Sequence, residues 1–228
     1  MVSIIVPTLN EEVAIPHTLR ALFALEGEKE IVVSDGGSAD KTLEIASSMG
    51  ARIVRSERGR GTQMHAGACA SSGEALWFVH ADTRPPPQAL NDLLAALHDP
   101  RVSGGNFGLQ FDGNSRAASQ LTFIYPFLRV LNLCYGDSGI FCRRSTYEAI
   151  GGFGNLALFE DLDLLRRLRK TGRFVHLGSR ILTSSRRFEN RKFWRMWLHW
   201  SALQVLYWCG ADPNCLARHY ADVRHRHG

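Results

Sequence analysis

A histidine and an aspartate two positions apart, His80 and Asp82, follow the apolar run "LWFV" and precede three prolines. If they continue a strand, residues i and i+2 point the same way. Asp82 then suits Mg²⁺ or Mn²⁺, which carboxylates and substrate phosphates commonly hold together, and His80 suits Mn²⁺ better than Mg²⁺. The alternative is a solvated strand end, in which Asp82 caps the next helix.

Acidic residues in two later segments are further candidates for chemistry. Glu160 and Asp161 in "FEDLDLL" open an amphipathic helix, where acids complement the helix dipole. A carboxylate there can also serve as a general base that takes a proton from an attacking hydroxyl. Asp137, in the loop "YGDSG", either caps that loop or meets an acceptor hydroxyl.

Two glycine-containing loops are candidates for ligand binding. Asp35 in "VVSDGGSADKT" can accept hydrogen bonds from a base edge or a ribose hydroxyl, or it can cap its own turn. The loop "RGRGTQMHAG" brings Arg58, Arg60 and backbone N–H groups to a helix start, where phosphate oxygens bind. It is not a P-loop, because no Gly-Lys-Ser/Thr follows.

The elements that position these residues alternate in the first half of the chain. Apolar, β-rich runs at 2–7, 30–35, 51–56 and 75–80 are each followed by a segment of helical spacing. This alternation predicts an α/β fold with a mostly parallel sheet flanked by helices. Right-handed crossovers would gather the polar strand ends on one edge, where ligands of open α/β sheets bind.

The second half is less regular. The spacing predicts strands over 103–111 and 139–144, an apolar helix over 119–135 bent at Pro126, and one or two strands over 174–185. We expect one domain over residues 1–188. Amphipathic helices over 189–228 then pack on it or extend it as a C-terminal appendage. Residues 104–140 and these helices would build an acceptor pocket.

Composition narrows the class of protein. The chain has 228 residues and a net charge of +5, with much of the positive charge late in the sequence. No segment is long and apolar enough to span a membrane, and the N-terminus lacks a basic leader, so we expect a cytoplasmic protein. Five scattered cysteines without a C-x-x-C pair favour neither a zinc site nor a disulfide framework.

The late basic segment "RKFWRMWLHW" interleaves Arg, Lys and Trp. This pattern is typical of a helix lying on a lipid surface, which would place the protein peripherally at the inner membrane face. Alternatively, the tryptophans pack over the domain or over a second subunit of a homodimer. We expect no nucleic acid partner, because no recognition motif accompanies the charge.

Taken together, the motifs resemble family 2 glycosyltransferases with the GT-A fold over residues 2–185. The motifs that carry the resemblance, in order, are "SIIVPTLNEE", "VVSDGGSADKT", "GRGTQMHAG", "LWFVHADT", "GDSGIFCRRSTYEAIGGF" and "FEDLDLLRRLRKTG". The later segments "TSSRRFE" and "LYWCGADPNCLARHY" resemble a small bacterial subgroup of selenodomain-associated transferases.

The resemblance implies a nucleotide-diphosphate sugar donor, with a UDP-sugar favoured. It also implies inverting transfer to a hydroxyl acceptor of unknown identity, for which a lipid-linked molecule is one candidate. It implies a divalent metal, Mn²⁺ or Mg²⁺, on Asp82, and Asp161 of the Glu160–Asp161 pair as catalytic base. The nucleotide-sugar would meet residues spread along the chain: Pro7, Asn10, Glu11, Asp35, Arg60, His80 and Asp137. His80 replaces the first aspartate of the family's Asp-x-Asp motif, and its imidazole can still bond the ribose.

Two other functions stay open at this point. A sugar-1-phosphate nucleotidyltransferase uses a related sheet, but it needs a glycine-rich N-terminal loop, and "PTLNEEVAIP" has no glycine. A non-catalytic module that binds a membrane surface through the C-terminal helix is the other alternative.

Overall fold

The computed structural model describes most of the chain. The described residues are 1–112, 119, 120, 122, 123, 125, 136–184 and 193–218, of which 193–197 are described as backbone. The predicted helix over 119–135 therefore lies mostly outside the described residues, as does the predicted domain boundary at 188. The division into 1–188 and 189–228 stays a prediction.

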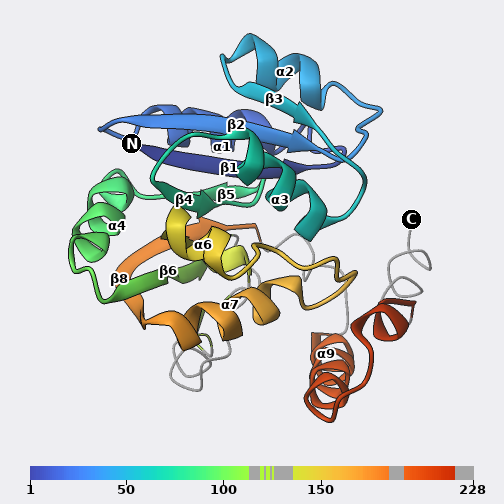
Figure 1. Cartoon of the computed structure of the whole chain (residues 1–228). Coiled ribbons are helices and arrows are strands. Elements are labelled where there is room, and N and C mark those ends of the chain that lie inside the picture. The colour runs from blue at the N-terminus through green and yellow to red at the C-terminus, as the bar shows by residue number, and fades with distance from the viewer. Residues whose placement is uncertain (113–118, 121, 124, 126–135, 185–192, 219–228) are drawn as a thin grey trace.

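One mixed sheet of eight strands forms the centre of the described structure, in the order β3-β2-β1-β4-β7-β6-β8-β5 (Figure 1). The strands are β1 Val2–Thr8, β2 Lys29–Asp35, β3 Arg52–Arg55, β4 Ala75–Phe78, β5 Thr83–Arg84, β6 Val102–Phe111, β7 Phe141–Arg143 and β8 Arg173–Thr183. The first four run parallel to one another, whereas β7 is antiparallel to both β4 and β6. The predicted α/β fold with strand–helix alternation is confirmed.

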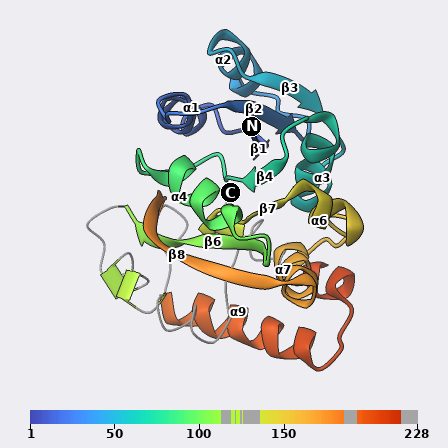
Figure 2. The same ribbon diagram turned by 60° about the vertical axis from the view of Figure 1, so that its left-hand side comes forward.

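Helices cover both faces of this sheet, which explains why its central strands are apolar on both sides. Figures 1 and 2 show α1 and α4 on one face and α3, α6 and α7 on the other. The helices are α1 Ile15–Phe23, α2 Thr42–Ser48, α3 Arg60–Ala70, α4 Ala89–His98, α6 Arg144–Ala149, α7 Glu160–Thr171 and α9 Phe193–Trp208, with a short 3₁₀ turn, η1, at Gly136–Ser138.

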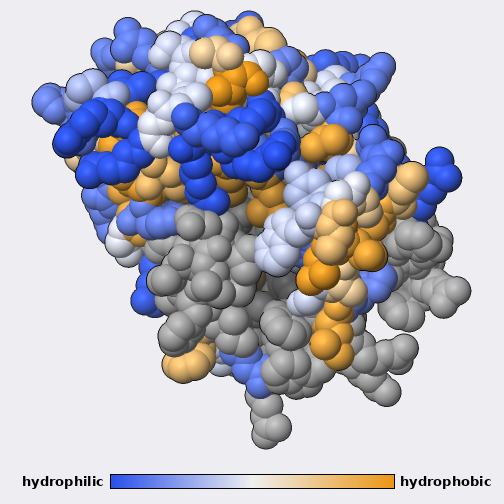
Figure 3. Space-filling model, turned by 60° about the horizontal axis from the view of Figure 1, so that its bottom comes forward, coloured by the Kyte–Doolittle hydropathy of each residue, from blue (hydrophilic) through white to orange (hydrophobic). Residues whose placement is uncertain are grey.

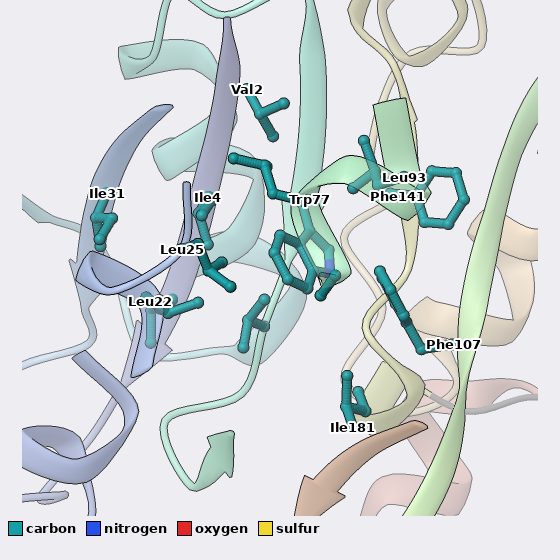
Figure 4. Packing of buried hydrophobic residues seen from close by; sticks show 14 of the residues in the cluster. Val2, Ile4, Leu22, Leu25, Ile31, Trp77, Leu93, Phe107, Phe141 and Ile181 are labelled. Atoms are coloured by element: carbon teal, nitrogen blue, oxygen red, sulfur yellow. The ribbon is translucent and has the colours of Figure 1, made fainter. Parts of the chain in front are cut away.

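The side chains of β1 and β4 divide between the two faces with the two-residue period of a strand. In β4, Trp77 joins the core under α1 and α4, while Leu76 and Phe78 join the core under α3, α6 and α7. Trp77 is fully buried, and its ring lies 5.1 Å from the ring of Phe107 on β6. Figure 4 shows Trp77 between the β1 side of this core and Phe107 and Phe141.

The C-terminal helix α9 packs against the start of α7, away from the main cores. Phe159, the residue directly before α7, stacks on Tyr207 with ring centroids 4.9 Å apart and meets Trp200 edge-on at 5.8 Å. Leu203 on α9 and Leu216 beyond it complete this small third cluster. No helix in the described parts of the chain combines the length and the apolar character needed to cross a bilayer.

Strands β6, β7 and β8 approach one another closely at Gly105. A methyl group there would lie 2.6 Å from the backbone oxygen of Val175 and 2.5 Å from the ring of Phe141. We expect Gly105→Ala to lower the free energy of unfolding by about 1–3 kcal/mol, the usual cost of overpacking, as measured by urea unfolding. Gly178→Ala is the control, because a methyl group at Gly178 meets nothing within 4 Å. Equal stability of the two variants would contradict this packing argument.

Candidate functional site

The parallel strands β1, β2, β3 and β4 end on one edge of the sheet, at Thr8, Asp35, Arg55 and Phe78. The loops after these strands carry most of the polar residues that the sequence singled out. Pro7 is half-buried near the end of β1, where it pairs with Ser34 of β2. The fold therefore brings these separate motifs to a shared edge, as the alternation of elements predicts.

Asp35 organises the turn that follows β2. Its carboxylate is 2% exposed and accepts hydrogen bonds from the backbone N–H groups of Gly37 and Ser38, both at 2.9 Å, and from the hydroxyls of Ser38 and Thr8. Burial raises the pKa of Asp35, but the hydrogen bonds from Ser38, Gly37 and Thr8 outweigh it and leave that pKa below its ordinary value. Asp35 is therefore ionised at neutral pH, and it holds residues 36–38 in place. The contact of Asp35 with a nucleotide base stays a prediction.

Asn10 and Glu11 lock the loop after β1 to the loop after β2. The Asn10 side-chain oxygen accepts a hydrogen bond from the Ala39 backbone at 2.8 Å, and the Asn10 backbone donates to the Ser38 hydroxyl at 2.9 Å. The Glu11 backbone N–H donates to Thr42 at 2.7 Å. Asn10 adopts a left-handed conformation, with φ 55°, which asparagine tolerates better than most residues. Both loops are thereby held as one unit at the strand ends.

Glu160 and Asp161 form a buried acidic pair at the start of α7, with side chains only 3% and 4% exposed. Arg60, at the start of α3, is their cationic partner. Its Nε donates to Glu160 Oε1, and a terminal nitrogen lies 3.6 Å from Asp161 Oδ2. Arg60 is thus in contact with the acidic pair, and its predicted contact with the nucleotide stays a prediction.

Backbone groups orient the Asp161 carboxylate. Gly136 N–H donates to its Oδ2 at 2.6 Å, and Leu162 N–H donates to its Oδ1 at 2.8 Å. Burial raises the pKa of Asp161, while Arg60 acts in the opposite direction, and the neighbouring Glu160 charge adds to the rise. A carboxylate with a raised pKa is a stronger base than an exposed aspartate, which suits general-base chemistry.

His80 and Asp161 meet at Gly136. A methyl group at Gly136 would lie 3.2 Å from both His80 Nε2 and Asp161 Oδ2, so these two atoms lie on the same side of that glycine. Gly136 is buried and belongs to η1, a segment that the sequence did not single out beyond Asp137. The structure therefore joins the histidine at the strand end to the acidic pair on α7.

The expectation that His80 and Asp82 continue a strand is wrong. Strand β4 ends at Phe78, and the Thr83 N–H donates to the His80 carbonyl at 3.1 Å, which closes a turn over residues 80–83. The Ala81 carbonyl also accepts a hydrogen bond from Thr18 of α1 at 2.6 Å. Because of this turn, the two side chains do not follow the alternation of a strand, and His80 points toward Gly136.

The protein groups at this edge fit a metal ion only together with a ligand's own oxygens. Within the described residues, no group of three or more His, Cys, Asp or Glu side chains could hold a metal ion. Asp82 supplies a half-buried carboxylate, while His80 points toward Gly136. Such a small donor set suits Mn²⁺ or Mg²⁺ when a diphosphate completes the coordination, as hard divalent cations commonly require.

Asn106 was missed by sequence reasoning. It is fully buried on β6, donates to the Ser138 hydroxyl of η1 at 2.9 Å, and pairs with His176 of β8 at 2.6 Å. It thereby anchors the turn that carries Gly136 and Asp137. The available signal was one amide side chain within the glycine-interrupted strand "SGGNFGLQF", but that pattern does not reveal its partners.

Comparison with known proteins assigns the chain to a family. Residues 3–150 match the model described as Glycosyl transferase family 2, a span that contains the strand-end loops and Gly136. The chain belongs to this glycosyltransferase family. The acidic pair at Glu160 and Asp161 lies beyond the matched span. The family assignment gives no support to the nucleotidyltransferase alternative.

One curated relative and two solved structures illustrate the similarity. The chain is 25% identical over 231 residues to the "Probable glycosyltransferase YdaM" of Bacillus subtilis, a match covering 88% of this chain and 54% of that protein. The chain thus spans about half the length of the curated relatives it matches, or less.

Among solved structures, the chain is similar to the mannosyltransferase PcManGT from Pyrobaculum calidifontis in complex with GDP-Man and Mn²⁺. The TM-score is 0.71 at 19% identity, covering 95% of this chain and 68% of that one. For S. aureus TarS 1–349 in complex with UDP-GlcNAc, the TM-score is 0.66 at 18% identity, covering 90% and 66%. These similarities establish the GT-A type fold of this glycosyltransferase family member.

The contact of Arg60 with the acidic pair predicts a pH-dependent loss of stability in Arg60→Gln. Without the guanidinium, the pKa of Asp161 rises further in the folded state, so protonation at lower pH restores part of the stability. Urea unfolding should therefore show a larger destabilisation at about pH 8 than at about pH 5.5.

Arg101→Gln is the matched control for this experiment. Arg101 pairs with Asp99 on the surface, where hydrogen bonds from Arg101 lower the pKa of Asp99 to about 2. Asp99 is ionised at both pH values, so this variant should show a small loss that does not change with pH. The same behaviour in Arg60→Gln would show that Arg60 does not neutralise the buried pair.

Proposed function

We propose that the chain transfers a sugar from a nucleotide-diphosphate sugar to a hydroxyl acceptor, with a divalent metal and with inversion at the anomeric carbon. The observation that carries the proposal is the buried Asp161 carboxylate, held beside His80 at Gly136 and at the edge where the parallel strands end. Membership of glycosyl transferase family 2 supports the class of reaction.

The donor is proposed from the strand-end loops and from the structural neighbours. We favour a UDP-sugar, because Asp35 holds the turn where the resemblance places uracil. The TarS structure with UDP-GlcNAc supports this choice, whereas the PcManGT structure holds GDP-Man. Pro7, Asn10 and Glu11 would face the nucleotide, with His80 at the ribose and Asp137 near the sugar.

In the proposed reaction, the oxygen of the acceptor hydroxyl attacks the anomeric carbon while Asp161 takes the hydroxyl proton. The bond from that carbon to the diphosphate breaks, and the nucleoside diphosphate leaves. The Gly136 and Leu162 N–H groups hold the carboxylate in one orientation, so little reorganisation accompanies the proton transfer. Arg60 opposes the rise of the Asp161 pKa that burial and Glu160 cause, which favours the ionised form that a base requires. A metal on Asp82, when bound, would offset the charge that develops on the leaving diphosphate.

Asp161→Asn tests the assignment of the base. The amide preserves the size of the side chain but cannot take the proton, so turnover should fall by about 100-fold or more while nucleotide binding persists. Turnover is measured as nucleoside diphosphate release and binding as a thermal shift. Asp163→Asn is the control two residues away, since Asp163 pairs with Arg166 and Arg167 outside the proposed site. Near-full turnover in Asp161→Asn would remove Asp161 from the mechanism.

Asp82→Ala tests the metal and the donor together. The wild-type chain should be stabilised by one nucleoside diphosphate among UDP, GDP and dTDP, and only with Mn²⁺ present. The variant should lose the Mn²⁺-dependent part of that thermal shift because the carboxylate ligand is gone. If Asp82→Ala kept the full thermal shift, the metal would bind elsewhere. If none of the three diphosphates stabilised the wild-type chain, the proposed donor class would be wrong.

A further inference from the structure

The outward face of α9 is apolar along its described length. Leu198, Val205, Leu206 and Trp208 are 60%, 51%, 48% and 59% exposed, and Ala202 between them is exposed as well. At 100° per residue these five positions fall within an arc of about 160°, so they form one stripe. Residues 196–211 contain no Asp, Glu, Lys or Arg, so no charge interrupts the stripe.

The opposite face of the same helix is already occupied. Trp200, Leu203 and Tyr207 pack on Phe159 and its neighbours. The helix is therefore held by its inner face, and the outward stripe is not needed for that packing. Figure 3, which brings forward the end of the molecule where α9 lies, shows an orange hydrophobic strip on the surface. An exposed apolar surface of this kind marks a site of association.

The charge of the sequence next to α9 indicates what covers the stripe. The ten residues 186–195, which lead into the first turn of α9, contain five cations and one acid. On the adjacent helix, Arg166 lies one turn beyond Leu162, which packs on the same small cluster, and its side chain is 65% exposed. Arg218 after α9 is also exposed. A basic sequence that adjoins an apolar helix is the pattern that binds an anionic lipid surface.

We propose that α9 docks this protein on an anionic lipid bilayer, with the stripe Leu198, Ala202, Val205, Leu206 and Trp208 in the interfacial region. Trp208, at the end of the stripe, has an amphipathic ring suited to that region. A bilayer is favoured over a second copy of the chain, because the basic sequence 186–195 next to α9 is complementary in charge to anionic headgroups.

The inner face of α9, opposite the stripe, lies next to the proposed site. Phe159 contacts α9 and is followed directly in the chain by Glu160 and Asp161. If the proposed function holds, on which this one point rests, the acceptor hydroxyl belongs to a molecule held in that bilayer. Lipid docking itself does not depend on sugar transfer.

Flotation with vesicles tests the docking. The full chain is mixed with vesicles of phosphatidylcholine and phosphatidylglycerol in a ratio of about 3:1, and with vesicles of phosphatidylcholine alone. We expect flotation with the anionic vesicles, weaker flotation with the neutral ones, and a decrease at high salt. Leu198→Glu and Leu206→Glu should each reduce the bound fraction roughly tenfold. Each change removes a leucine that would insert into the bilayer and adds a negative charge that the anionic lipids repel.

Leu94→Glu is the matched control, since Leu94 is a 40% exposed leucine on α4, far in the sequence from α9. It makes the same change in charge and should float like the wild type. Circular dichroism and the midpoint of thermal unfolding confirm that each variant is folded.

Three outcomes would overturn the proposal. These are no flotation of the wild-type chain, flotation unchanged by Leu206→Glu, and a wild-type dimer without flotation that Leu206→Glu converts to a monomer. The last outcome would identify a second copy of the chain as the occupant of the stripe. None of these readouts uses a donor or turnover, so they are independent of the proposed sugar transfer.

Discussion

The proposed site depends on placing two carboxylates side by side in a buried position. Glu160 and Asp161 occupy adjacent positions with almost no exposure to solvent, a costly arrangement without compensation. The compensation comes from separate parts of the chain: the Arg60 guanidinium on α3, the Gly136 N–H in η1, and the start of α7 itself. The buried pair therefore depends on each of these elements being in place.

This requirement explains several features that look unrelated in the sequence. A methyl group at Gly136 would press on both His80 and Asp161, each at 3.2 Å, so the absence of a side chain lets this turn approach both residues. Gly61, one residue after Arg60, is similarly tight, because a methyl group there would lie 3.2 Å from the Glu160 side chain. Asn106 holds the Gly136 turn from the sheet side through Ser138. These residues position the acidic pair without themselves being acids or bases.

The sequence predicts the parallel half of the fold well because its signals are local. Apolar runs that are each followed by a segment of helical spacing identify β1, β2, β3 and β4, and the ordered motifs predict the family. The turn at residues 80–83 was not predicted, since it depends on Thr18 of a distant helix bonding Ala81. The Arg60–Glu160 contact joins residues 100 positions apart, and no local pattern contains that information. The same is true of Asn106 and of the aromatic cluster around Phe159.

The left-handed backbone of Phe159 has a consequence for the order in which parts of the site are completed during synthesis. Phe159 is buried with φ 62°, a left-handed conformation that is unfavourable for a large side chain, and the rings of Trp200 and Tyr207 hold it there. Synthesis runs from the N-terminus, so the residues of the parallel strands β1–β4 are made well before those of α9. The residue before the acidic pair acquires its ring partners only after position 207 has been made. The residues of the sheet edge that would hold a donor are thus all made before the acidic pair can gain its final support.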